Sequence, residues 1–339
     1  AVLQAASACE ALKRTFLTHP AMSVVFLKRI PCLFLFAASF ATNVHAEKAQ
    51  AGKTIRLLTV GNSFSANATH YLGNIAKAAG DTLILREDNV GGASMEVHWK
   101  KAQAFEKDPK DKLGLYTKGK SLKMDLTEEH WDVITFQQAS ILSHDLKTYR
   151  PFAKQLSDYI RTLAPDATLL LHETWEYRLD DPRFSAKAPK PGDPKTQDEM
   201  YKRLSNAYDT VAKELNVKRL PVGDAFHLAN RDPQWGFHAI TPPFDSKKAK
   251  PGELPNQVHS LNVGWKWKKT GEKNTLGMDG HHASMAGEYL GACVWYEVIF
   301  GKSVENNTFV PKGLDADYAK FLRITAHRVV QEEKQKQGA

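Results

Sequence analysis

Ser63 stands where a hydroxyl could act as a nucleophile. The apolar run at residues 55–60 predicts a buried strand, and a helical segment begins near Ala66. Between them lies the turn 61–65, with the sequence GNSFS. A serine on such a turn holds its hydroxyl out of the sheet, and free N–H groups of the helix face any negative charge that develops beside it. The simpler interpretation is that Ser63 or Ser65 caps the helix.

A candidate base for this serine stands far along the chain. Asp279 and His282 are three residues apart, directly before a long apolar run at 284–300. On a turn or a first helical turn they share a face. The carboxylate could then bind one imidazole nitrogen, leaving the other to take a proton from a serine. Two alternatives stay open: Asp279 as a helix cap, and metal ligation through Asp279, His281 and His282.

Strand-like and helix-like stretches alternate between these two regions. Strands are expected at residues 55–60, 82–87, 131–136, 168–172 and 219–222, and helices at 71–79, 95–105, 149–163, 197–215, 284–300 and 314–331. A Lys-rich loop is expected at 107–125. Strands separated by helices predict a parallel sheet covered on both faces.

Polar or glycine-rich turns follow four of the expected strands. They contain Ser63, the pair Gly91-Gly92, the pair Gln137-Gln138 and the pair His172-Glu173. The active crevice of a parallel α/β sheet lies beyond the carboxyl ends of its strands. These turns are therefore expected to meet at one edge, and His172 and Glu173 are further candidates for substrate contacts.

On these motifs the chain resembles the SGNH (GDSL-type) hydrolases, in an exported bacterial branch. Residues 61–65 stand where the family has Gly-Asp-Ser-x-Ser, residues 279–282 match its Asp-x-x-His block, and Gly91-Gly92 fits its glycine block. The resemblance covers residues 54–301. It implies a flavodoxin-like three-layer α/β/α sandwich with a mostly parallel five-stranded sheet, and an esterase that uses a serine and needs neither metal nor cofactor.

The resemblance also implies roles for individual residues. Ser63 would be the nucleophile, His282 the general base and Asp279 its orienting acid. The backbone amides of Ser63 and Gly92 would donate to the oxyanion, an interaction typically worth about 10²–10³ in rate per donor in acyl transfer.

The sequence departs from the family pattern at two places. Asn62 replaces the usual Asp, which is expected to change little because that side chain is outside the triad. No Gly-x-Asn-Asp block follows the third strand, so Gln137 or Gln138 is assigned as the third oxyanion donor. The alternative is a Gln pair that only ties neighbouring loops together.

The amino-terminal part has the pattern of a secretory signal peptide. A basic start after Met22, an apolar run at 30–41 and small residues before Glu47 form this pattern. We expect an exported, periplasmic or extracellular protein without a membrane span in its mature form. The expected division is an upstream extension at 1–21, a signal peptide at 22–46, and one hydrolase domain at 47–335 with insertions at 178–196 and 229–278.

Charge and cysteine content narrow the partners. Of the formal net charge of +8, the segment 1–46 carries four basic residues and one acidic residue, so the mature chain has a mild excess of +5. No aromatic-basic array accompanies it, and nucleic acid is not an expected partner. Cys293 is the single cysteine after residue 46, which excludes an internal disulfide.

Export and the loop tryptophans suggest a substrate. Trp175, Trp235, Trp265 and Trp267 could offer flat faces to sugar rings, or could simply pack loops. The leading hypothesis is removal of acetyl groups from carbohydrate. Cleavage of lipid or aryl esters is the runner-up. A catalytically inactive sugar-binding protein and a metal-dependent phosphoesterase are alternatives of other classes.

Overall fold

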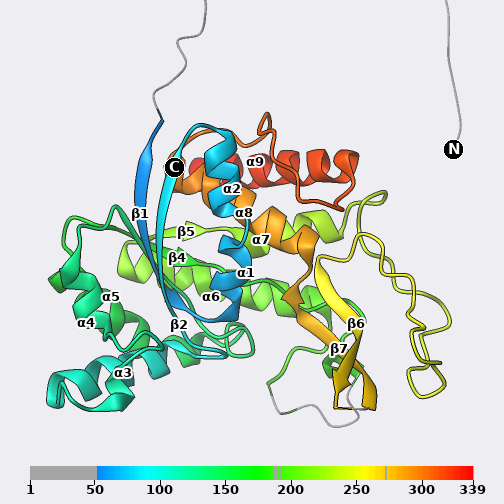
Figure 1. Ribbon diagram of the computed structural model, residues 1–339, viewed down its shortest axis with the longest axis horizontal. Helices are drawn as coiled ribbons and strands as arrows, with labels where there is room; N and C mark the ends of the chain where they lie inside the picture. Colours follow the sequence, from blue (N-terminus) through cyan, green and yellow to red (C-terminus); the bar gives the residue numbers. More distant parts are fainter. Residues whose placement is uncertain (1–51, 186–189, 191, 272, 339) are drawn as a thin grey trace, which may run out of the picture. The chain divides into compact units, whose positions relative to one another are not determined.

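The computed structural model describes residues 52–185, 190, 192–271 and 273–338 (Figure 1). The expected upstream extension and signal peptide, at 1–21 and 22–46, lie outside the described residues. The chain from Gln50 onward forms one compact unit.

The centre of this unit is a five-stranded sheet. Its strands are β1 (Thr54–Gly61), β2 (Thr82–Asn89), β3 (Val133–Phe136), β4 (Thr168–His172) and β5 (Lys218–Leu220). The order is β2-β1-β3-β4-β5, and every neighbouring pair is parallel. All four residues of β3 are buried, as expected for a strand whose two faces are both covered.

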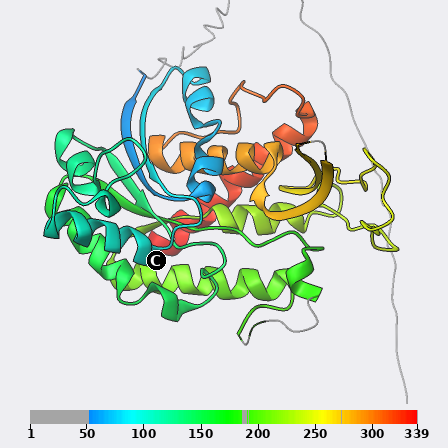
Figure 2. The same cartoon turned by 60° about the horizontal axis from the view of Figure 1, so that its bottom comes forward.

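Helices cover both faces of this sheet (Figures 1 and 2). One layer contains α1 (Ser63–Thr69), α2 (Leu72–Ala78), α7 (Val222–Asn230), α8 (Met285–Phe300) and α9 (Ala316–Gly338). The other contains α3 (Met95–Lys107), α4 (Leu122–Glu128), α5 (Phe152–Leu163) and α6 (Gln197–Leu215). Short 3₁₀ turns lie at η1 (Lys112–Gly114), η2 (Leu146–Tyr149) and η3 (Pro182–Ser185). The predicted three-layer α/β/α sandwich is confirmed.

Helix α8 holds α1 in place from within the core. Its side chains are buried around its whole circumference, including Tyr289, Cys293 and Trp295. At Gly291 an added Cβ would lie 3.2 Å from the Cα of Ala68 in α1. A larger residue there would push the two helices apart. Since α1 begins at Ser63, this close packing fixes the helix that carries the candidate nucleophile.

Two segments expected to be irregular contain regular structure. The region 229–278 includes the end of α7 and most of a hairpin formed by β6 (Asn262–Thr270) and β7 (Lys273–Ala283). Trp265 and Trp267 alternate with lysines on β6, a period-two pattern typical of a strand. The expected Lys-rich loop at 107–125 contains η1 and the start of α4. Both predictions of irregular structure are wrong: the lysines at 107–125 and the prolines and tryptophans at 229–278 suggested loops where the structure has these elements.

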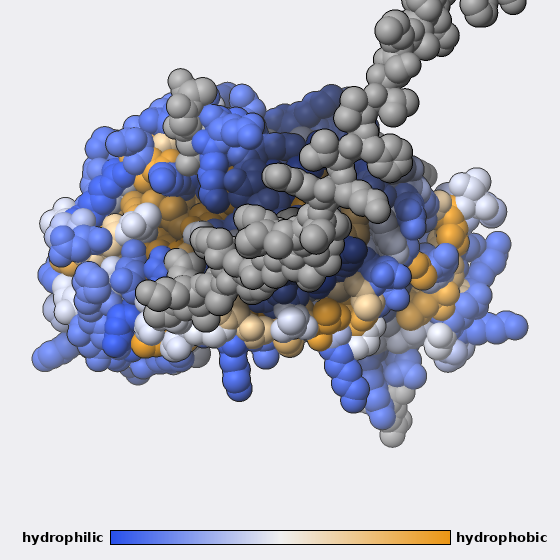
Figure 3. All heavy atoms as spheres, turned by 90° about the horizontal axis from the view of Figure 1, so that it is seen from above, coloured by the Kyte–Doolittle hydropathy of each residue, from blue (hydrophilic) through white to orange (hydrophobic). Residues whose placement is uncertain are grey.

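The surface is mixed. On the face shown in Figure 3, hydrophilic residues predominate and apolar residues form smaller groups among them. Among the described residues no helix is both long and apolar enough to cross a bilayer.

Candidate active site

Ser63 is the first residue of α1, and its neighbour Asn62 caps that helix. The Asn62 Oδ1 accepts a hydrogen bond from the Phe64 amide at 2.9 Å, while its Nδ2 donates to the Ala93 carbonyl at 2.9 Å. The capping interpretation of Ser63 and Ser65 is therefore wrong. Asn62 uses both ends of its amide, and an ionised aspartate could not make the donation to Ala93. Asn62 was expected to differ little in effect from the usual Asp. Instead, its side chain links α1 to the turn that carries Gly92.

The structure brings Ser63, His282 and Asp279 into one chain of hydrogen bonds. The Nε2 of His282 lies 2.9 Å from the Ser63 Oγ. Its Nδ1 lies 3.1 Å from Oδ1 and 3.2 Å from Oδ2 of Asp279. With Nδ1 donating to the carboxylate, Nε2 is the nitrogen free to accept the serine proton.

An irregularity in β7 allows Asp279 and His282 to face each other. In a regular strand, residues three apart point to opposite faces. Here Gly264 pairs with Asp279 and Asn262 pairs with Ala283, so the register shifts between these two pairs. The expected turn or first helical turn is therefore a strand irregularity, and α8 begins only after Ser284, which caps it. The shared face was predicted, but its structural cause was not.

Charge around Asp279 favours its ionised form. The Nζ of Lys266, on β6, lies 2.8 Å from Oδ2. Burial works to raise the pKa of Asp279, but hydrogen bonds from His282 and Lys266 outweigh it and hold this pKa well below its usual range. Burial, aided by His282, lowers the pKa of His281 to about 4. At neutral pH the site thus holds one carboxylate that can orient and stabilise a protonated His282.

A pocket of about 250 Å³ opens over the serine. Its lining includes Ser63, Gly92, Tyr177, Arg183 and His282. The amide of Ser63 lies at the start of α1, where a backbone N–H has no acceptor within the helix. Gly92 has φ +67° and open space where a Cβ would stand. Neither amide donates to a protein acceptor within the described residues. Both can therefore serve an oxyanion.

Gln137 and Gln138 do not line this pocket, and the assignment of either as a direct oxyanion donor is wrong. The Gln137 Nε2 donates to the Asn62 Oδ1 at 3.0 Å. The Gln138 Nε2 donates to the Thr148 carbonyl at 2.8 Å. Both side chains are buried with their donors engaged. The alternative, a Gln pair that ties loops together, describes what the structure shows.

Gln137 instead supports the helix that carries Ser63. Its Oε1 accepts hydrogen bonds from the Ser65 hydroxyl and, at 3.0 Å, from the His172 Nδ1. Its Nε2 bonds to the capping Asn62. The network therefore joins the carboxyl end of β4 to the first turn of α1.

We predict that Gln137→Ala lowers the free energy of unfolding by about 2–4 kcal/mol. The substitution leaves buried polar groups of Ser65, His172 and Asn62 without their hydrogen-bond partner, and each unpaired group typically costs about 1–3 kcal/mol. Esterase activity at a temperature where the variant stays folded should fall less than about tenfold. A stable variant that has lost about 10²–10³ in kcat would instead identify Gln137 as an oxyanion donor.

Trp175, His172 and Glu173 are core residues, so their proposed substrate contacts are also corrected. Trp175 is fully buried between the rings of Phe64 and Phe226, with centroids 4.3 and 4.5 Å away. Its Nε1 donates to the His281 carbonyl at 2.9 Å. It packs beneath the end of β7 and offers no face to a sugar. Glu173 is fully buried and pairs with Arg219 at 3.1 Å.

Two buried neutral histidines flank the candidate nucleophile. His98 lies 3.0 Å from the Gly61 carbonyl through Nε2 and 2.8 Å from the Tyr116 hydroxyl through Nδ1. Burial lowers the pKa of His98 to about 4 and that of His172 to about 3. Because both imidazoles are buried, the folded state favours their uncharged forms.

We predict that His98 and His172 contribute a loss of stability as pH falls from 7 to 5. In the unfolded chain these histidines take up protons near pH 6.5, whereas in the folded chain they do so only near pH 3–4. The unfolded state therefore binds more protons, and each histidine costs on the order of 2 kcal/mol of stability over this range. Denaturant titrations at the two pH values measure this. His98→Gln, which keeps a donor and an acceptor, should flatten the dependence, and an unchanged slope would contradict the assignment.

Asp279, His281 and His282 also form a group with metal-ligand character. Their candidate ligand atoms all lie within 4.8 Å of one another. The His281 Nδ1 is 3.3 Å and the His282 Nδ1 is 3.1 Å from the same carboxylate oxygen. Lys266 occupies the other oxygen of Asp279 at 2.8 Å, and a cation there opposes a metal ion.

Two pocket residues, Tyr177 and Arg183, and the Asp279 partner Lys266 were not predicted from the sequence. Arg183 and Tyr177 come from the expected insertion at 178–196 and its border, and Lys266 comes from β6. The guanidinium of Arg183 lies 4.3 Å from the Tyr177 ring, and its Nη2 lies 3.3 Å from the His281 Nδ1. Insertion loops carry no pattern that marks such residues, so only the fold reveals them.

Several proteins of known structure are similar to this chain. The chain resembles the crystal structure of a DUF4886 family protein from Bacteroides uniformis, with 23% identity, a TM-score of 0.60, and coverage of 82% of this chain and 95% of the other. That likeness reflects a shared fold. No protein of curated function matches the sequence.

More distant structures include a candidate SGNH hydrolase from Slackia heliotrinireducens, with 21% identity, a TM-score of 0.43, and coverage of 72% and 98%. A candidate GDSL-like lipase from Parabacteroides merdae has 14% identity, a TM-score of 0.41, and coverage of 75% and 100%.

A family model described as a domain of unknown function, DUF4886, matches residues 56–230. The match includes Ser63 and Gly92 but ends before the segment that supplies Asp279 and His282. Because it spans more than half of the chain, we conclude that this protein belongs to the DUF4886 family.

Proposed function

We propose that this protein is an exported serine esterase that removes small acyl groups, acetyl foremost, from carbohydrate. The observation that carries the proposal is the hydrogen-bonded chain from Ser63 through His282 to Asp279, at the mouth of a pocket of about 250 Å³. A hydroxyl, an imidazole and an ionised carboxylate in this order form the arrangement that activates a serine.

Acyl transfer would begin when the Ser63 Oγ attacks the ester carbonyl carbon and its proton moves to the His282 Nε2. The negative charge that develops on the carbonyl oxygen would face the amides of Ser63 and Gly92. Protonated His282, held by Asp279, then gives its proton to the departing alcohol. Water attacks the acyl-enzyme, again losing a proton to His282, and the acid leaves while Ser63 regains its proton.

The size of the pocket supports a short acyl group. Ala139 and Tyr177 take part in its lining, and its volume lies below the usual range of about 300–1,000 Å³ for sites that enclose drug-sized ligands. A long acyl chain would have to extend beyond this pocket. This favours acetyl esters over lipid esters, which remain the alternative substrate.

A screen of released acids tests this proposal. Purified protein without residues 1–46 is incubated with p-nitrophenyl esters from acetyl to decanoyl and with acetylated xylan, mannan and pectin. We expect acetate release, falling steeply with acyl length. Preference for decanoyl esters would favour the lipid alternative, and absence of any Ser63-dependent release would overturn the esterase.

The cluster of Asp279, His281 and His282 supports one alternative function, a metal-dependent phosphoesterase. Treatment with a chelator, followed by assay on p-nitrophenyl acetate and p-nitrophenyl phosphate, separates the two. Acetate hydrolysis that survives the chelator supports the serine mechanism. Phosphatase activity that is lost with the chelator and restored by Zn²⁺ or Mn²⁺ supports the metal.

A further inference from the structure

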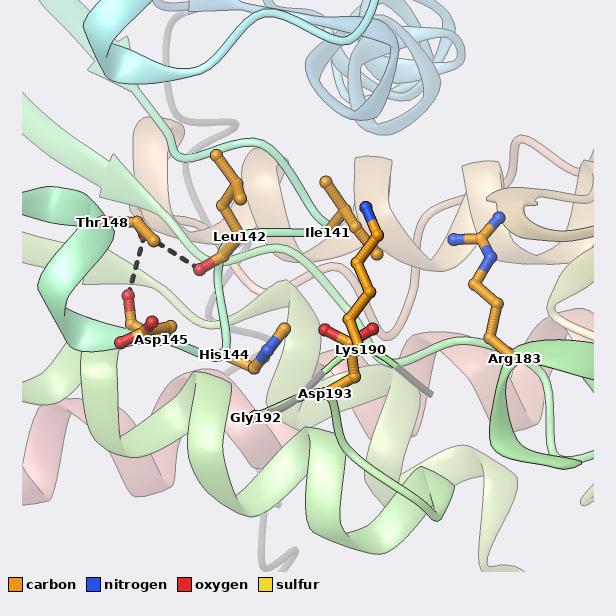
Figure 4. Close-up of a pocket in the computed structure, with 9 residues that line it drawn as sticks. All are labelled: Ile141, Leu142, His144, Asp145, Thr148, Arg183, Lys190, Gly192 and Asp193. Atoms are coloured by element: carbon orange, nitrogen blue, oxygen red, sulfur yellow. Dashed lines mark hydrogen bonds between the residues drawn. The ribbon is translucent and has the colours of Figure 1, made fainter. Parts of the chain in front are cut away.

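A second cavity, of about 370 Å³, adjoins the pocket over Ser63. Figure 4 shows the residues that line this second cavity. The two share Ile141 and Arg183 in their linings. The walls of the second cavity come from the loop after β3, from η3 and from Lys190, Gly192 and Asp193. A ligand held in the Ser63 pocket can therefore extend past Ile141 and Arg183 into the second cavity.

The charges of this cavity are balanced. Arg183 and Lys190 supply two cations, and Asp145 and Asp193 supply two carboxylates. Burial and the nearby Arg203 lower the pKa of the neighbouring His144, so its imidazole is neutral at pH 7. An anionic ligand would meet both carboxylates and a cationic one both basic groups. This lining suits a neutral molecule that both donates and accepts hydrogen bonds.

His144 interacts with the Gly192 backbone and with the Asp193 carboxylate, yet both side chains keep unused hydrogen-bonding capacity within the described residues. His144 is 7% exposed, and its Nδ1 has no hydrogen-bond partner among the described residues. The Asp193 carboxylate is half-buried and accepts no hydrogen bond within the same part of the chain. A buried polar nitrogen left unpaired is unfavourable. Entry of a hydroxyl-bearing ligand, with a small shift of the ring, would satisfy both groups.

Apolar side chains complete the lining. Ile141 is 45% exposed and Leu142 is 36% exposed on the loop after β3. Exposed aliphatic groups beside polar ones fit a sugar ring, which carries C–H faces as well as hydroxyls. The same combination would bind a fatty chain poorly, because four charged groups would lose water without gaining partners.

We propose that this second cavity is a subsite for a neutral sugar unit next to the one that bears the acyl ester. The proposal rests on the proposed esterase function and specifies its leaving group: an oligosaccharide or polysaccharide alcohol. Asp193 and His144 bind hydroxyls of the neighbouring unit, and Arg183 separates this subsite from the reacting ester.

Two measurements test the subsite. The first compares kcat/KM for p-nitrophenyl acetate, an acetylated methyl xyloside and acetylated xylotriose, with the corresponding mannose series. The second measures binding of deacetylated oligosaccharides to Ser63→Ala by calorimetry, which needs no catalysis. The test variant is Asp193→Ala, since its carboxylate accepts no hydrogen bond from the residues that the structure describes. The matched control is Asp166→Ala, an exposed carboxylate that precedes β4 at the other end of that strand.

We expect acetylated trisaccharides of at least one series to be hydrolysed at least tenfold more efficiently than the monosaccharides. Asp193→Ala should remove about tenfold of this advantage through KM, which corresponds to about 1.4 kcal/mol. Its loss of activity on p-nitrophenyl acetate should be much smaller than its loss on the trisaccharide, and Asp166→Ala should change neither activity.

Two failures are distinguishable. If Ser63-dependent cleavage of p-nitrophenyl acetate occurs but both glycan series show no length dependence and no calorimetric binding, the subsite is overturned and the esterase stands. If p-nitrophenyl acetate is not cleaved, the proposed function fails, and oligosaccharide binding that depends on Asp193 would still support the sugar site. Equal losses on all substrates in Asp193→Ala would show a structural role and overturn the subsite.

Discussion

Replacing Ser63 with alanine should reduce ester hydrolysis by about 10⁵–10⁶-fold, the loss typical when the nucleophile of a serine triad is removed. The reason is chemical, since no other hydroxyl lies against the His282 Nε2 in the described structure, where the Ser63 Oγ is 2.9 Å away. The measurement is the initial rate of acetate release, together with the melting temperature of the variant.

The fold should survive this change. Among the described residues the Ser63 side chain bonds only to His282, and α1 is capped by Asn62 rather than by the serine. Ser65→Ala is the matched control, because its hydroxyl is buried and bonds to Gln137. That variant should lose stability while keeping most of its activity. Full activity in Ser63→Ala would exclude the proposed mechanism.

Asp279→Asn has the second largest expected effect, a loss of about 10⁴ in kcat. The new amide can donate to the His282 Nδ1, which would place the imidazole proton on Nε2. That nitrogen could then donate to Ser63 but could not accept its proton. The variant would also lose the negative charge that stabilises protonated His282 during the reaction.

Lys266→Met provides the control for Asp279→Asn. It removes the cation 2.8 Å from the Asp279 Oδ2 but leaves the carboxylate against His282. We expect it to reduce activity by tenfold or less. Circular dichroism and melting temperature should show that both variants fold. If Asp279→Asn keeps near-normal kcat while Lys266→Met abolishes it, Asp279 does not orient the base.

The strength of local patterns explains which elements could be predicted. The α6 helix repeats its apolar residues at helical spacing, and it spans residues 197–215 as expected. β4 is a short apolar run that ends at His172, again as expected. By contrast, β6 alternates tryptophan with lysine on a half-exposed hairpin. Its pairing with β7 is a contact between segments, which composition alone does not reveal.

Local sequence patterns predicted that Ser63 and Gly92 follow the carboxyl ends of strands, because a strand followed by a polar turn is a local signal. They also marked Asp279 and His282 as a pair. The positions of these residues depend on contacts between distant segments. These contacts are the register shift in β7, the close approach of α1 and α8 at Gly291, and the salt bridge from Lys266 to Asp279.

The roles of the amide side chains were decided in the same way. An amide that follows a strand can donate to a ligand or to its own protein, and the residue type is the same in both cases. Gln137 turns toward Asn62 and His172, and Trp175 turns into the core, because burial and hydrogen-bond partners are set by segments distant in sequence. Short local motifs therefore predict the chemistry of this site, whereas tertiary packing decides which residues face the substrate.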